Sequence, residues 1–129
     1  MNGNTVNGNT VNGNTANGNT MTDDSIAAVL EDIRHLIVDG NRIVASGRGR
    51  FFDPGDRTMR LAAKAIVIGL QSAADRLPDW FRDQHPAVAW DELRAMSSYL
   101  ALHDSSIDYE IVWNALTTDF PHLGWQLAL

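Results

Sequence analysis

Apolar residues recur at three- and four-residue steps along most of the chain, which is the spacing of one face of an α-helix. The first such run follows the acidic and hydroxyl residues at 22–25, which suit the start of a helix, and it extends to about Ala45. Gly40 and Asn41 are candidates for an interruption, and the two glycines of segment 46–50 predict the end of the helix. The apolar positions of this helix are Ile26, Val29, Leu30, Ile33, Leu36, Ile37, Ile43 and Val44.

A second helix is predicted from about Asp56 to Arg76, after a turn at 51–56. The two aromatic residues of that turn, Phe51 and Phe52, are expected to close the end of the core. The centre of the helix is apolar on nearly all sides, so we expect it to be buried on more than one side. Its small residues would let a neighbouring helix approach closely: Ala62, Ala63, Ala65, Gly69, Ala73 and Ala74.

The C-terminal half predicts a short helical turn at 79–83 and a third helix at 90–102, capped by Asp91 or just before it. A fourth helix is expected at about 108–118, and the prolyl segment 119–121 predicts its end. Its inward positions are predicted to be Ile111, Val112, Ala115 and Leu116. Alternation with period two is nowhere long enough for a strand, so we predict an all-α antiparallel four-helix bundle.

The first twenty residues differ in composition from the rest of the chain. They are four copies of a five-residue unit, MNGNT, VNGNT, VNGNT and ANGNT. Asn, Gly and Thr offer little apolar surface to offset the entropy lost on ordering a chain. The sequence therefore predicts a disordered repeat tail at 1–20 and one helical domain at 21–129.

Several classes of site are excluded or disfavoured by residue type. The chain has no cysteine, which excludes disulfides and thiolate metal sites and fits a cytoplasmic location. Its apolar runs fall short of the ~18 residues that a membrane span needs, so we expect no membrane partner. The four histidines have no metal-ligand spacing, so neither a metal nor a cofactor is expected: His35, His85, His103 and His122.

Charge is unevenly distributed along the chain. The net charge of −6 argues against broad, sequence-independent binding to nucleic acid. Segment 42–64 is the exception, because it carries six basic residues against two acidic ones. It is either a solvated loop and helix start or a patch that faces phosphates or a partner. For the second interpretation, the candidate RNA- or partner-binding residues are Arg48, Arg50, Arg57, Arg60 and Lys64.

Two stretches of the C-terminal half are the most informative part of the sequence. They read WDELRAMSSYLALHD at 90–104 and IDYEIVW at 107–113. Together with FFD at 51–53, AADRLP at 73–78 and FPHL at 120–123, they resemble the HEPN superfamily. The nearest match within it is the HepT-like toxins of bacterial HEPN–MNT toxin–antitoxin pairs.

The resemblance implies a homodimeric, metal-independent endoribonuclease with a motif of Arg, four residues, His, one residue and Tyr. A guanidinium neutralises the charge that grows on a phosphate in the transition state. A histidine near neutral pKa moves the proton of the 2′-hydroxyl or of the leaving group. The resemblance also implies a cognate MNT-type nucleotidyltransferase, which in the family attaches AMP to the toxin and silences it.

This chain departs from that motif. Aligned on the flanking tryptophans, the Arg position falls on Ser97 and the His position on Leu102. A shift by one residue recovers His103, and the nearest arginine is Arg94. We therefore take Arg94 and His103 as the candidate catalytic residues and expect ribonuclease activity to be weak or lost.

Each candidate also has a structural interpretation. His103 suits the end of a helix, where carbonyl groups are exposed, and Arg94 suits an ion pair with Asp91 or with a neighbouring helix. Tyr99 and Tyr109 suit half-buried packing rather than modification. Three functions remain open: a HepT-like protein that acts on RNA, a catalytically inactive HEPN dimer that binds a nucleotidyltransferase, and an unrelated helical scaffold.

Overall fold

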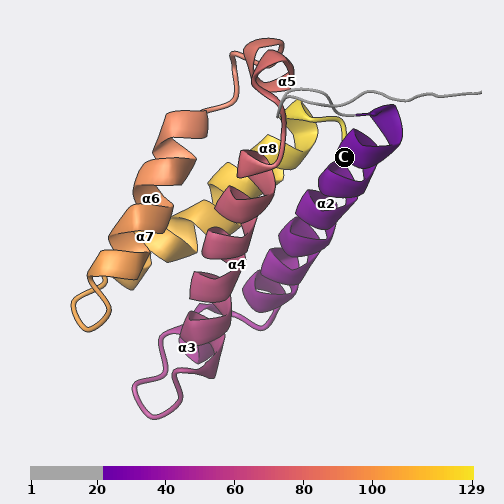
Figure 1. Cartoon of the computed structure of the whole chain (residues 1–129). Helices are drawn as coiled ribbons and strands as arrows, with labels where there is room; N and C mark the ends of the chain where they lie inside the picture. Colours follow the sequence, from indigo (N-terminus) through magenta and orange to yellow (C-terminus); the bar gives the residue numbers. More distant parts are fainter. Residues whose placement is uncertain (1–21) are drawn as a thin grey trace, which may run out of the picture.

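The computed structural model describes residues 22–129, and every regular element within this range is a helix (Figure 1). The all-α class that the sequence predicts is confirmed for this part of the chain, whereas the predicted tail at 1–20 lies outside it. The elements are α2 (Asp23–Ala45), α3 (Arg48–Phe51), α4 (Thr58–Asp75), α5 (Asp79–Asp83), α6 (Trp90–Leu102), α7 (Tyr109–Asn114), the π-helix η3 (Ala115–Asp119) and α8 (Phe120–Gln126).

Helix α2 is continuous through the predicted interruption at Gly40. Thr22 caps its start, because the Thr22 side chain accepts a hydrogen bond from the Ser25 N–H. Gly40 is buried, and a Cβ atom placed on it would lie 3.2 Å from Leu116 Cδ2. This glycine therefore lets η3 approach α2 closely and does not break the helix.

Helix α4 packs against α2 in the opposite direction. Near the middle of the pair, a Cβ on Gly69 would lie 3.3 Å from the Leu36 side chain, so the expected close approach of a neighbouring helix is confirmed here. At one end, Arg76 just after α4 donates to Asp32 in the first half of α2 at 3.0 Å. Figure 1 shows the two helices side by side.

Helix α6 lies on the other side of α4, also antiparallel to it. Asp75 at the end of α4 contacts Arg94 near the start of α6, and Lys64 near the start of α4 pairs with Asp104 just after α6. The bounds of α6 match the prediction, and of the two predicted cap positions, Asp91 or just before it, the structure has the one before Asp91. Ala89 occupies the cap position without a side-chain hydrogen bond.

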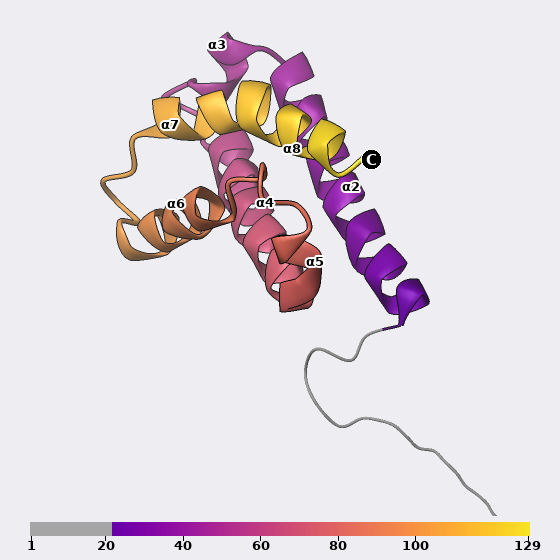
Figure 2. The same cartoon turned by 90° about the horizontal axis from the view of Figure 1, so that it is seen from above.

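The predicted end of the last helix at residues 119–121 is wrong. The chain runs through α7, η3 and α8 as one rod, which Figure 2 shows crossing over α2 and α4. The Phe120 N–H bonds to the Ala115 carbonyl, five residues back, so the helix widens just before Pro121. Pro121 then lies in the first turn of α8, where a missing N–H is tolerated. Leu123 and Leu127 supply the buried face that keeps the segment against the core.

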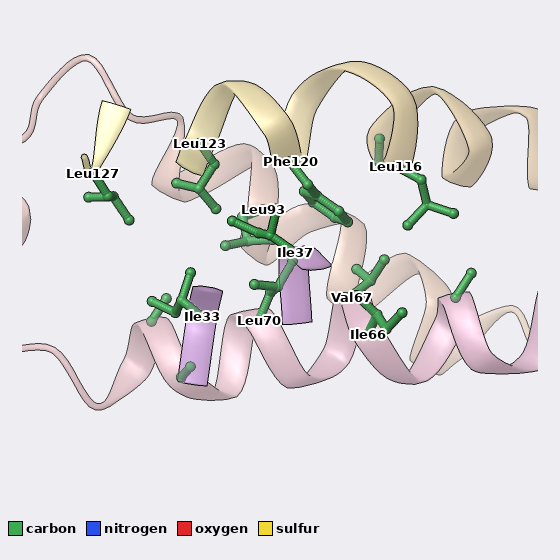
Figure 3. Close-up of a cluster of buried hydrophobic side chains, with 14 of the residues drawn as sticks. Ile33, Ile37, Ile66, Val67, Leu70, Leu93, Leu116, Phe120, Leu123 and Leu127 are labelled. Atoms are coloured by element: carbon green, nitrogen blue, oxygen red, sulfur yellow. The ribbon is translucent and has the colours of Figure 1, made fainter. Parts of the chain in front are cut away.

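The core lies between the α7–α8 rod and the α2–α4 pair. In Figure 3, Leu116, Phe120 and Leu123 point from the rod toward Val67 and Leu70 of α4. Of the inward positions predicted in α7 and η3, Ile111 is wrong, because 44% of it is exposed. The largest fully buried side chains are Phe51, Ile33, Leu70, Leu77, Leu100, Leu116, Val67 and Val112. Among the described helices, none is both long and apolar enough to cross a membrane.

Candidate functional site

The basic segment lies at one end of the molecule, where α3, the start of α4, the loop after α6 and the start of α7 meet (Figure 1). The Phe51 ring holds these elements together from inside. It is fully buried, and its ring centre lies 5.0 Å from that of Trp113 and 4.9 Å from that of Phe52. The prediction that Phe51 and Phe52 close the end of the core is therefore confirmed.

Arg60 fastens the turn before α4 to this cluster. Its guanidinium donates to the carbonyl oxygens of Phe51 at 2.7 Å and Asp53 at 3.0 Å, and it lies 6.0 Å from the centre of the Tyr109 ring. These contacts occupy the guanidinium in holding the turn against the cluster. Arg60 was predicted as a binding residue, but its guanidinium stabilises the fold through these contacts.

The Arg48 side chain also has partners within the fold. It donates to both carboxylate oxygens of Glu110, one of them at 3.0 Å, and it lies over the Phe52 ring at 4.5 Å. The hydrogen bond from Arg48 lowers the pKa of the Glu110 carboxyl and raises the pKa of the Arg48 guanidinium. Both side chains are more than half exposed, so this pair adds little to stability. It does neutralise one of the predicted binding charges.

Lys64 pairs with Asp104, the residue after His103. The hydrogen bond from Lys64 lowers the pKa of the Asp104 carboxyl, and the nearby charge of Arg57 lowers it further. Lys64 is mostly buried along its stem, with 19% of the side chain exposed, whereas Asp104 is 83% exposed. The ammonium group is therefore fixed in place beside the segment that contains His103.

Arg50 and Arg57 are the cations of this end that remain available. Both are exposed, and neither side chain forms a hydrogen bond or an ion pair with any residue in the described part of the chain. Arg50 lies close enough to Asp56 for its charge to contribute to the lowered pKa of that carboxyl, although hydrogen bonds from Thr58 are the larger cause. Two unpaired guanidinium groups near Lys64 form a surface that is suited to phosphate.

His103 lies at this same end and terminates α6. It is the C-cap residue of the helix, and its N–H bonds to the Tyr99 carbonyl at 3.0 Å. The predicted position at a helix end is therefore confirmed. The imidazole is exposed, and its centre lies 5.0 Å from that of the Tyr99 ring. Tyr99 is partly buried, and its hydroxyl accepts from the Asp108 N–H at 2.8 Å, which favours its interpretation as a packing residue.

Arg94 is held elsewhere on the molecule. It donates to Asp75 at 3.0 Å, so the predicted ion pair is formed with the neighbouring helix. Gln71 donates to the same Asp75 oxygen at 2.8 Å and is buried, and its Oε1 atom has no hydrogen-bond partner among the described residues. Sequence reasoning missed Gln71 and Asp75, because only the register between α4 and α6 places them beside Arg94.

The two residues at the motif positions face different surroundings. Ser97 is partly buried on α6, and Leu102 is 78% exposed at the end of that helix. Neither side chain can act as a guanidinium or an imidazole. Within one protomer, the structure therefore brings His103 together with the basic segment and leaves Arg94 near the opposite end of α4.

Among residues 22–129, no group of three or more histidine or carboxylate side chains is arranged to hold a metal ion. The His85 Nδ1–H donates to the Phe81 carbonyl at 2.8 Å, and the imidazole stacks on the Phe81 ring, while His122 stacks on Trp125. These histidines have packing roles.

Similarity to known proteins is limited to one part of the chain. Over 61 residues, which is 47% of this chain, it is 31% identical to a protein of Caldanaerobacter subterraneus subsp. tengcongensis that carries the provisional name of an RNase. The chain spans about half the length of this curated relative, because the match covers 53% of it. No protein-family profile matches the chain, and no solved structure matches it. The similarity points to ribonuclease-like proteins.

Proposed function

We propose that this chain is a HepT-like, HEPN-type helical bundle that acts on RNA, with weak or lost ribonuclease activity. The observation that carries the proposal is the 31% identity to a protein named as an RNase. The basic end supports it, because Arg50 and Arg57 are unpaired there and Lys64 and His103 lie at the same end. Phosphate contacts of this kind supply most of the affinity for RNA.

Cleavage needs a guanidinium close to the imidazole, and within one protomer Arg94 is held by Asp75, away from His103. We propose that a homodimer brings Arg94 of the partner subunit toward His103. The surface that we propose for the dimer contact carries large exposed apolar residues of two adjacent helices: Leu61 and Ile68 on α4, and Leu102 on α6. Burying these residues between two copies would remove apolar surface from water.

A second candidate function is a catalytically inactive dimer that binds an MNT-type nucleotidyltransferase. The specific observation in its favour is Leu102, because an apolar residue at the His position of the motif is 78% exposed. An exposed leucine at the end of a helix is better suited to a protein contact than to proton transfer. Co-purification with the nucleotidyltransferase of the neighbouring reading frame, lost in Leu102→Asp, would favour this function.

RNA binding by the basic end is tested with the full chain and a fluorescent single-stranded oligoribonucleotide. We expect Arg50→Gln with Arg57→Gln to weaken binding about tenfold and to reduce the slope of affinity against salt by about one to two. The matched control is Arg34→Gln with Arg42→Gln, which removes the same charge from α2, where both arginines pair with acids of that helix. Equal affinity of wild type and both double variants would contradict the proposed RNA surface.

A further inference from the structure

A cavity of about 260 Å³ opens between α6 and α8, apart from the basic end. Its floor is apolar and is made of buried and partly buried side chains from both helices and from the loop before α6. Leu93, Phe120 and Leu123 meet there, as Figure 3 shows, and Val88 and Met96 complete the floor. Small-molecule sites in proteins are usually concave and apolar in this way, with a few polar groups that orient the ligand.

Two acidic side chains stand among the polar groups that line this cavity. Glu92 of α6 and Asp119 of η3 line it, and both carboxylates are exposed. Neither forms a hydrogen bond or an ion pair with another residue of the described chain, in contrast to Asp75 and Asp104, which are paired. The residues that line the cavity, all within 22–129, include no lysine or arginine, and their other polar side chains are those of Gln126 and of His122, which stacks on Trp125. Two carboxylates therefore line an apolar hollow that no lysine or arginine shares.

The cavity is also held open by a fixed wall. Gln126 of α8 donates from its Nε2 atom to the Ala87 carbonyl at 2.8 Å, which fastens the loop before α6 to the end of α8. Trp90 strengthens the same loop, because its indole Nε1 donates to the His85 carbonyl at 3.1 Å. A wall built from such contacts is already in place before a ligand arrives, so little ordering entropy opposes binding.

We propose that this cavity binds a small organic cation with an apolar body about the size of one aromatic ring and a protonated amine. The ring would lie on Phe120, Leu123 and Leu93, and the ammonium group would pair with Glu92 and Asp119. Glu92 lies eleven residues before His103 on the same helix, a separation of about 16 Å along the axis. The site is therefore independent of the RNA surface proposed above.

The charge requirement is tested with three probes of matched shape: 2-phenylethylamine, 2-phenylethanol and 3-phenylpropanoate. Binding is followed on the ¹⁵N-labelled full chain by amide chemical shifts, with calorimetry for affinity. We expect the amine to bind with a dissociation constant of about 1 mM and the alcohol and the acid to bind at least about fivefold more weakly. Amide shifts should map to Ala89, Leu93 and Leu123.

Two variants separate charge from shape. Glu92→Gln with Asp119→Asn should weaken amine binding about tenfold and leave alcohol binding unchanged. Ala87→Leu, at an exposed lining residue, should weaken both probes by filling the hollow. The control Asp24→Asn with Asp83→Asn makes the same change in net charge away from the cavity and should bind like wild type. Equal binding of amine and alcohol, shifts outside the cavity, or no binding at about 20 mM amine would overturn the proposal.

Discussion

Arg94 donates a hydrogen bond of 3.0 Å to Asp75, and this contact holds Arg94 at the C-terminal end of α4. His103 lies beside the Lys64–Asp104 pair, near the N-terminal end of the same helix. Lys64 and Asp75 are separated by eleven residues of helix, or about 16 Å along the axis. A guanidinium and an imidazole that cooperate on one phosphate must both contact it, so a single protomer does not assemble the pair.

We expect the purified protein to cleave RNA weakly or not at all. Where residual cleavage is measured on a labelled RNA substrate, Arg94→Ala and His103→Ala should each reduce it about a hundredfold or to background. Glu92→Gln serves as the control, because it changes a neighbouring charge on α6 and leaves both candidates in place. Strong cleavage that survives both alanine variants would show that Arg94 and His103 are not the catalytic residues, and segment 42–64 would then be the next target.

The protein should be a homodimer at tens of micromolar, which light scattering measures directly. Leu61 and Ile68 are 48% and 37% exposed on α4, and we expect Leu61→Glu with Ile68→Glu to give a monomer, because charges would be buried between the two copies. Trp125→Glu is the matched control, since Trp125 is 78% exposed on α8 and lies outside the proposed face. A monomeric wild type, or dimers in both variants, would contradict this face.

The helices of this fold could be predicted from the sequence because apolar spacing is a local signal. Capping residues are local signals as well: the start of α2 follows from those at 22–25, and the predicted bounds of α6 match the structure. The continuation of the last helix through Pro121 could not be predicted, because the π-turn at η3 that accommodates the proline depends on tertiary packing of Leu116 and Leu123. Local pattern favours a stop at a proline, and burial of the following apolar face overrides it.

In the candidate site too, the local sequence pattern could be predicted and the long-range contacts could not. Clustering of basic residues in segment 42–64 is visible in the sequence, but the neutralising partners are not, because Asp104 and Glu110 lie 40 and 62 residues away from Lys64 and Arg48. Which cations remain unpaired therefore depends on the register of α4 against α6 and of α3 against α7. The cavity between α6 and α8 was not predicted either, because the sequence predicts no helix beyond residue 118.

The contact between Gly40 and Leu116 predicts a steep dependence of stability on side-chain size. Gly40→Ala should change the free energy of unfolding by less than about 1 kcal/mol, because better helix propensity offsets the contact at 3.2 Å. Gly40→Leu should lower it by about 2–3 kcal/mol through overpacking. Urea denaturation measures both. Asn41→Leu, at an exposed neighbouring position, should remain close to wild type, and a Gly40→Leu variant as stable as Asn41→Leu would contradict close packing of η3 on α2.

Deleting residues 1–20 should leave the melting temperature unchanged. The segment carries no charged residue, and its repeating Asn, Gly and Thr residues provide little apolar surface to bury. Calorimetric melts of the full chain and of residues 21–129 should overlap. A loss of several degrees, which corresponds to about 1 kcal/mol for a domain of this size, would show that the segment contacts the helical domain.

Stability should decrease as pH falls below about 5, and the ion pairs of the basic end should contribute to that decrease. The pKa of Glu110 is lowered in the folded protein by the hydrogen bond from Arg48, from an ordinary value of 4.5. The unfolded chain therefore binds a proton more readily than the folded one. The contribution of the pair is present above the ordinary value and is lost as pH falls through the lowered pKa.

Arg48→Met removes this partner, so the variant should lose less stability than wild type between about pH 5 and pH 3 and should differ little from it at pH 7. Arg42→Met is the matched control, because Arg42 is 78% exposed and reaches Asp39 only at 3.4 Å. Urea denaturation across this pH range measures the effect. If Arg48→Met and Arg42→Met follow the same pH dependence as wild type, the Arg48–Glu110 contact is not maintained in solution, and Arg48 then joins Arg50 and Arg57 as a cation available to bind phosphate.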